Sequence, residues 1–172
     1  MSPSVIALLR AVHVLAGAFW VGGMLLLTGF VLPAIRASGP AGGQVMRTMV
    51  QVRRLPVYLN IAVGLAVLSG LTLFWWTSGG FSHDWLSSGT GRTISVGGAL
   101  GIVAAIIGGV VSGPTAARIG RLGAAIQASG APPTPEQSVE LQRLQRRLDG
   151  AARVVTVLIV GTALCMGAAR YL

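Results

Sequence analysis

Four long runs of apolar residues, separated by shorter polar segments, dominate the pattern along the chain. A helix needs about 20 consecutive apolar residues to cross the hydrocarbon core of a bilayer. The runs predict four membrane-spanning helices, here called spans one to four, over residues 5–33, 57–77, 94–113 and 151–169. We therefore expect an all-α, polytopic membrane protein whose four transmembrane helices form an antiparallel bundle, a single domain over residues 1–172.

The polar segment between spans three and four has a helical pattern of its own. Leucines recur at steps of three and four between residues 141 and 148, which places them on one helix face. Thr134 followed by Gln137 is the pattern of a capping box at the start of a helix. We expect spans three and four to extend into the cytoplasm as a helical hairpin over about residues 116–149, closed by the stretch SGAPP. Arginine-rich amphipathic helices lying on the lipid headgroups are the alternative.

The distribution of arginine predicts the orientation of the spans. All 13 basic residues are arginine, against 4 acidic residues, and the net charge is +9. Most arginines lie between spans one and two or between spans three and four, whereas the 78–93 segment has Arg92 opposed by Asp84. The positive-inside rule places the arginine-rich segments in the cytoplasm, so both termini and the 78–93 loop face outside. An aromatic belt is expected at that outer boundary, formed by Trp75, Trp76, Phe81 and Trp85.

The composition supports a membrane location and argues against several function classes. The chain is 53% hydrophobic and 10% charged, whereas about a quarter of the residues in soluble domains are charged. No Asp or Glu lies inside a predicted span, which argues against proton-coupled pumps and carriers. The arginines lie between apolar runs, so we expect a lipid bilayer and no nucleic acid as partner. The only two histidines do not complete a hydrolase set, and we do not expect an enzyme.

Small residues four positions apart form a groove along one face of span three. Close backbone approach drives helix association in lipid, because burial from water does not. Packing within the bundle is the simpler interpretation of the groove, and a seam with other membrane subunits is the alternative. The groove residues are Gly97, Gly101, Ala105, Gly109 and Gly113, with shorter stripes at Ala62, Ala66 and Gly70 in span two and at Ala163 and Gly167 in span four.

A histidine inside span one is the main candidate for a functional residue. His13 shares one helix face with Gly17 and Trp20. Neutral imidazole is a common metal ligand, and Gly17 leaves space for a flat cofactor beside it. The alternatives are a structural hydrogen bond from His13 to a carbonyl, to Asn60 or to a serine on a neighbouring helix, and a hydrogen bond to a quinone. His83, in the outer loop, is the other candidate metal ligand.

The stretch LRAVHVLAGAFWVGGMLLLTGFVLPAIR resembles the first span of the copper-resistance D (CopD) superfamily of small polytopic membrane proteins, to which the HemJ-type protoporphyrinogen oxidases are distantly related. The approach to span two is also similar, with Ser69-Gly70 where relatives often show Thr-Gly. A basic residue, Arg92, precedes span three as it does in relatives. The matching positions in span one are His13, Gly17, Trp20, Gly22 and Pro33.

The resemblance implies copper handling or, by likeness to the HemJ type, haem b held by the first-span histidine, which is His13 here. Relatives tend to have Lys at the start of span three, where this chain has Arg92. Arginine has no lone pair to give, so Arg92 would pair with a haem propionate instead of ligating the iron. The resemblance leaves the second axial ligand to His83, to a methionine or to another subunit.

Three functions follow as hypotheses. The first is a cofactor-binding or electron-transfer module in the cell inner membrane, with haem b or, less readily, copper held near the outer leaflet by His13, Gly17, Trp20 and Arg92. The second is a non-catalytic accessory subunit of a larger membrane complex. A HemJ-like oxidase, which needs a cavity for a porphyrinogen, is a third.

Overall fold

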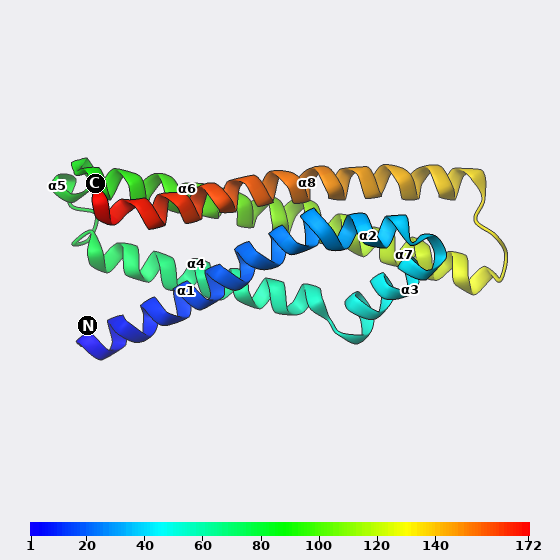
Figure 1. Ribbon diagram of the computed structural model, residues 1–172, viewed down its shortest axis with the longest axis horizontal. Helices are drawn as coiled ribbons and strands as arrows, with labels where there is room; N and C mark the ends of the chain where they lie inside the picture. The colour runs from blue at the N-terminus through cyan, green and yellow to red at the C-terminus, as the bar shows by residue number, and fades with distance from the viewer.

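The chain forms an elongated, all-α bundle of four long helical segments (Figure 1). The computed structural model describes the backbone of residues 1–172 and every side chain except that of Pro40. Along this backbone 90% of the residues are helical and none is in a strand. Four segments of the described chain are long and apolar enough to cross a membrane: Pro3–Ala37, Leu55–Thr77, Gly89–Ser129 and Pro135–Tyr171. The prediction of a polytopic, all-α membrane protein is confirmed.

Each long segment is built from helices joined without a break or nearly so. The first contains α1 (Pro3–Leu26), the π-helical turn η1 (Leu27–Val31) and α2 (Leu32–Ala37), and the second is α4 (Leu55–Thr77). The third contains α6 (Gly89–Ile107), the π-helical turn η3 (Gly108–Ser112) and α7 (Gly113–Ser129), and the fourth contains α8 (Pro135–Ala168) and the 3₁₀ turn η4 (Ala169–Tyr171). The connections contain α3 (Gly39–Arg47), the π-helical turn η2 (Thr48–Val52) and α5 (His83–Ser87).

The helices extend well beyond the apolar runs that predict them. Span three was expected over 94–113, yet its helix continues from Gly89 to Ser129. Hydropathy marks the residues that suit lipid, whereas a helix ends only where its backbone hydrogen bonds end. The two widened turns η1 and η3 precede Pro33 and Pro114. A proline inside a helix clashes with the carbonyl four residues earlier, and a π-helical turn relieves that clash without ending the helix.

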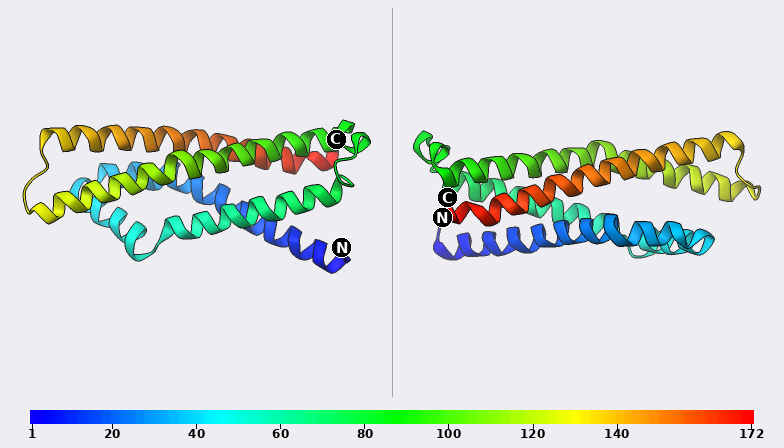
Figure 2. Two further views of the ribbon diagram at one scale, coloured as in Figure 1. Left: turned by 180° about the vertical axis from the view of Figure 1, so that it is seen from behind. Right: turned by 45° about the horizontal axis from the view of Figure 1, so that its top comes forward.

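The four segments pack as two antiparallel pairs, α1 with α4 and α6 with α8 (Figure 2). Both termini and α5 lie at one end of the bundle, and the hairpin between α7 and α8 lies at the other (Figure 1). The two pairs meet in a core that buries Trp20 between small and branched residues of the other three long helices. The other buried members of this core are Ala16, Ala66, Ala104, Val155 and Ile159.

The small-residue groove of span three is only partly filled by the bundle. A Cβ added at Gly97 would lie 2.8 Å from Cβ of Cys165, and one at Gly101 would contact Thr162 at 3.5 Å. These two glycines therefore let α6 approach α8 closely, whereas Gly109 and Gly113 are exposed. The expected stripe of span four differs from the structure. Ala163 and Gly167 face outward, because the face of α8 toward α6 passes through Thr162 and Cys165.

The helical hairpin beyond the core begins and ends with local signals. Gly130 ends α7 in the left-handed region at φ +64°. Thr134 Oγ1 accepts from the backbone N–H of Gln137 at 3.3 Å, and the side-chain oxygen of Gln137 accepts from the N–H of Thr134 at 2.9 Å. This reciprocal pair is the capping box expected from the sequence. α7 packs against α8, so the two helices continue the bundle.

Aromatic side chains gather at the opposite end, where α4 leads into α5. Phe81 contacts Phe74 and Trp75 with ring centroids 5.6 and 5.1 Å apart, and the rings of Phe74 and Trp85 form a T-shaped pair at 5.4 Å. Phe81 has a positive φ of 67°, which turns the chain back so that its ring reaches α4. Three of the four residues expected in an aromatic belt thus form one cluster around Phe74.

Candidate functional site

His13 joins α1 to α4 through its imidazole ring. Its Nδ1 lies 2.8 Å from the carbonyl oxygen of Ala66. A carbonyl oxygen only accepts hydrogen bonds, so Nδ1 carries the proton and donates it. In the neutral imidazole the other nitrogen, Nε2, is then unprotonated and keeps a free lone pair. The half-buried ring therefore has one nitrogen engaged in helix packing and one available as an acceptor or ligand.

Ser69 supports the same orientation of the ring. Its Oγ lies 3.4 Å from Nδ1 of His13. The hydroxyl of Ser69 also lies within hydrogen-bond distance of the carbonyl oxygens of Leu65, at 2.5 Å, and Ala66, at 3.3 Å. A hydroxyl both donates and accepts, so this contact agrees with a protonated Nδ1 and does not fix the tautomer by itself. The tautomer of His13 is set by the Ala66 carbonyl, which only accepts.

Gly70 makes this contact between α1 and α4 sterically possible. A Cβ at this position would lie 2.7 Å from Cε1 of His13 and 3.1 Å from Nδ1. Real Cβ atoms do not approach ring atoms that closely, so any larger residue would push the imidazole away from α4. Gly70 and the buried Ala66 belong to the small-residue stripe of span two. These small residues let the imidazole of His13 come close to the backbone of α4.

Gly17 and Trp20, which share the helix face of His13, lie in different surroundings. A Cβ at Gly17 would have no atom within 4 Å, so the space beside this turn of α1 is open. Trp20 is 7% exposed and packs in the core where the two helix pairs meet. The turn of α1 at Gly17 therefore faces no other protein atom closely, and one turn further on the indole of Trp20 is packed in the core.

Arg92 and His83 are not brought to His13. Arg92 is exposed in the first turn of α6, where its Nε donates to the carbonyl oxygen of Ser88 at 3.5 Å. With the whole backbone described, no Cα atom of α6 lies within 8 Å of a Cα atom of α1, and the two helices meet only through side chains deeper in the core. The side chain of His83 is 93% exposed, with Nδ1 3.9 Å from a carboxylate oxygen of Asp84. The structure thus separates the histidines and leaves Arg92 outside the surroundings of His13.

Sequence reasoning foresaw a carbonyl or a serine as a partner for His13 but did not identify which. Asn60, the named alternative, is exposed near the other end of α4. The actual acceptor is a backbone atom, which any residue type supplies, so no side-chain pattern marks Ala66. The available signal was the coincidence of the span-two stripe with the Ser69-Gly70 pair on one face of a helix.

Comparisons of the chain with protein-family models, with curated proteins and with solved structures find no match. The site is therefore interpreted from its own chemistry. It offers an oriented imidazole with a free Nε2, an open turn at Gly17 and a backbone held close by Gly70.

Proposed function

We propose that this chain is an integral membrane module that holds a haem-type cofactor through Nε2 of His13. The hydrogen bond from Nδ1 of His13 to the carbonyl oxygen of Ala66 carries the proposal. Metal-ligating histidines commonly donate their other ring N–H to a carbonyl, which fixes the ring and makes the ligating nitrogen more basic. His13 already has this arrangement, with its second nitrogen free to ligate.

A haem suits a single histidine better than a bare copper ion does. A haem supplies its own ring nitrogens and needs only axial ligands from the protein. A copper ion takes most of its ligands from protein side chains. Leaving aside the side chain of Pro40, no three residues of the types His, Cys, Asp and Glu come together as a metal-binding group. Copper is therefore the less favoured cofactor in this proposal.

The residues around His13 have distinct roles in the proposal. When bound, a haem supplies one-electron redox chemistry. His13 would hold the haem through Nε2, while the Ala66 carbonyl fixes the tautomer of the ring and Ser69 contacts the same ring nitrogen. Gly17 leaves room beside the ring, and Gly70 lets the ring reach the α4 backbone. A propionate ion pair with Arg92 is not part of the proposal, because Arg92 is exposed in the first turn of α6 and the α6 backbone does not come close to α1.

The test is the visible spectrum of the protein purified from native membranes, oxidised and then reduced with dithionite. We expect a Soret band that is lost in His13→Ala and kept in His83→Ala, which removes the same kind of side chain from an exposed position. An absorption band unchanged in His13→Ala, or a wild-type spectrum without a Soret band, would refute the proposal.

An accessory subunit of a larger membrane complex is the second candidate. The observation that favours it is the exposed half of the span-three groove, where Gly109 and Gly113 are exposed and no atom lies within 4 Å of a Cβ built at Gly109. These two glycines are not covered by the other helices of this chain. Co-purification of defined membrane proteins from native membranes, lost on Gly109→Leu, would support this function. A partner-free particle after mild extraction would contradict it.

We further propose that the chain lies in a cell inner membrane with both termini and the 78–93 loop outside. The support is the concentration of arginine in the segments at the hairpin end of the bundle. A fusion of alkaline phosphatase to the C-terminus should be active, and a green fluorescent protein fusion at the same place should be dark. The opposite pair of results would invert the topology.

A further inference from the structure

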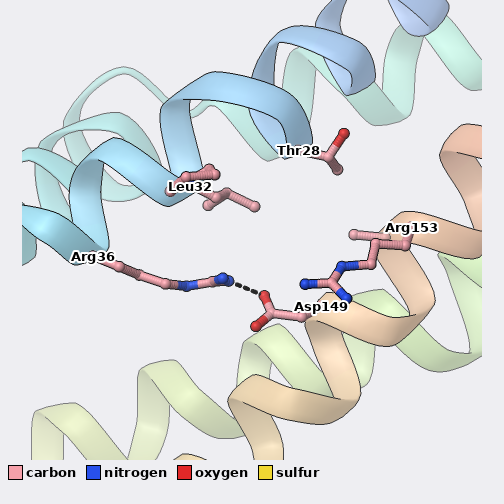
Figure 3. A pocket seen from close by; sticks show the side chains of 7 residues that line it. Thr28, Leu32, Arg36, Asp149 and Arg153 are labelled. Carbon is pink, nitrogen blue, oxygen red and sulfur yellow. Dashed lines mark hydrogen bonds and ion pairs between the residues drawn. The ribbon is translucent and has the colours of Figure 1, made fainter.

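A small polar cavity lies where the first long segment crosses α8, far from His13. Thr28 of η1 and Arg36 of α2 line it on one side, and Asp149 and Arg153 of α8 line it on the other (Figure 3). Its volume is about 50 Å³. Fifteen residues separate Thr28 from His13, which corresponds to about 22 Å along a helix. The cavity is therefore a site of its own, at the arginine-rich end of the spans.

The charges around this cavity leave an excess of positive charge. Arg36 donates to the Asp149 carboxylate in an ion pair that joins α2 to α8 (Figure 3). Arg153 has no ion-pair partner among the described side chains, which are all except that of Pro40. Two guanidinium groups thus face one carboxylate. A single additional anionic group at the mouth of the cavity would balance the charge.

A shallow apolar surface of α8 begins at the same arginine. It is formed by Arg153, Val154, Val157 and Leu158, which all belong to this one helix. Val157 is 71% exposed and Val154 49% exposed, so this surface faces lipid. These residues follow Arg153 along α8 into the apolar part of span four. Arg153 therefore lies between a charged cavity and an apolar helix surface that runs toward the middle of the membrane.

We propose that this part of the bundle binds one anionic phospholipid. Its phosphate contacts the guanidinium of Arg153 at the mouth of the cavity, and one acyl chain lies along Val154, Val157 and Leu158. Arginine pairs well with phosphate oxygens, and basic pockets between membrane helices bind anionic headgroups. A cavity of about 50 Å³ is too small for a whole headgroup, since one water occupies about 30 Å³ in the liquid. The cavity thus admits a phosphoryl oxygen or water behind Arg153.

The experiment is native mass spectrometry of the purified full chain in detergent, titrated with dioleoylphosphatidylglycerol. We expect one tightly bound lipid, with the apparent dissociation constant raised about tenfold in Arg153→Gln, the loss of roughly one charge-assisted contact. Arg146→Gln is the matched control, because Arg146 is exposed on the same helix and does not line the cavity. Equal weakening in both variants would overturn the proposal, since it would show attraction by net charge alone.

Two further ligands distinguish the possible sources of phosphate. Dioleoylphosphatidylcholine should bind more weakly than phosphatidylglycerol, and inorganic phosphate at millimolar concentration should not displace the bound lipid. Equal binding of phosphatidylcholine, or displacement by inorganic phosphate, would overturn the proposal of an anionic lipid site. The haem proposal is unaffected by any of these outcomes, because the measurement does not involve His13.

Asp149→Asn gives an opposite prediction at the same place. It removes the one negative charge lining the cavity and leaves both arginines. We expect phosphatidylglycerol to bind more tightly to this variant, provided that its circular dichroism shows the wild-type helix content. Unchanged or weaker binding by a folded Asp149→Asn variant would contradict the electrostatic argument.

Discussion

Replacing Gly70 by alanine tests the contact between His13 and α4 directly. The added methyl group would lie 2.7 Å from Cε1 of His13, so the imidazole must rotate away. The rotation stretches or breaks the 2.8 Å hydrogen bond from Nδ1 to the Ala66 carbonyl. The change is small in volume and adds no polar group. Its effect therefore reports on the fit between one ring and one helix backbone.

The expected cost has two parts. Interhelical hydrogen bonds in a membrane protein average about 0.6 kcal/mol, with a maximum near 1.7 kcal/mol. Forcing a methyl group into a packed seam typically costs about 1–3 kcal/mol, and the lower end applies here because the displaced atoms are the tip of a side chain. We expect Gly70→Ala to destabilise the bundle by about 2 kcal/mol relative to a matched Gly→Ala change elsewhere in α4.

Gly64 provides the matched control. It lies in the same helix, and a Cβ built there would have no atom within 4 Å. The gain in helix propensity from Gly to Ala, about 1 kcal/mol in an exposed helix, applies to both variants and cancels in the comparison. The assay is reversible unfolding in mixed micelles titrated with dodecyl sulfate and followed by circular dichroism.

A double-mutant cycle assigns the effect to the histidine. In a His13→Ala background the methyl group of Ala at position 70 meets no ring, so the difference between Gly70→Ala and Gly64→Ala should fall to near zero. If Gly70→Ala is as stable as Gly64→Ala in the wild-type background, or if their difference persists without His13, the described packing is refuted.

Two further predictions concern the rest of the bundle. Gly97→Ala should destabilise it by about 1–3 kcal/mol, because the new Cβ would lie 2.8 Å from Cβ of Cys165. Gly98→Ala should not destabilise it, since a Cβ at Gly98 meets no atom within 4 Å. Thermal unfolding of the two variants checks this prediction, and equal melting temperatures would contradict it. Hydrogen bonds from its own backbone N–H and from Thr134 lower the pKa of Glu136, so its ionisation stabilises the start of α8 above the unfolded-state pKa and that contribution is lost as the pH falls through the folded-state pKa. Thr134→Ala should raise the pKa of Glu136 toward its ordinary value in a carbon-detected NMR titration, and an unchanged value would show that the cap does not act on this carboxylate.

The sequence by itself determined the features that depend on local chemistry. Long apolar runs are helices in lipid because every backbone group must be hydrogen-bonded within its own segment, so the four spans could be read directly. Gly130 and the Thr134–Gln137 pair marked the turn of the hairpin because caps act within a few residues. The helix ends could not be predicted in the same way, since hydropathy does not show where the backbone hydrogen bonds of a helix end.

Tertiary structure decided which glycines and which polar groups matter. Gly64 and Gly70, or Gly97 and Gly98, are alike in sequence and differ only in what faces them. The acceptor of His13 is a main-chain carbonyl, which no residue type marks.

The polar cavity is the clearest case of a site that only the tertiary structure assembled. It joins Arg36 to Asp149 across 113 positions of sequence. Long-range pairs of this kind are set by how two helices cross, and the crossing depends on the summed packing of the α1–α4 and α6–α8 pairs. Local patterns therefore gave the helices and their spans, and only the packed bundle created the sites that those helices share.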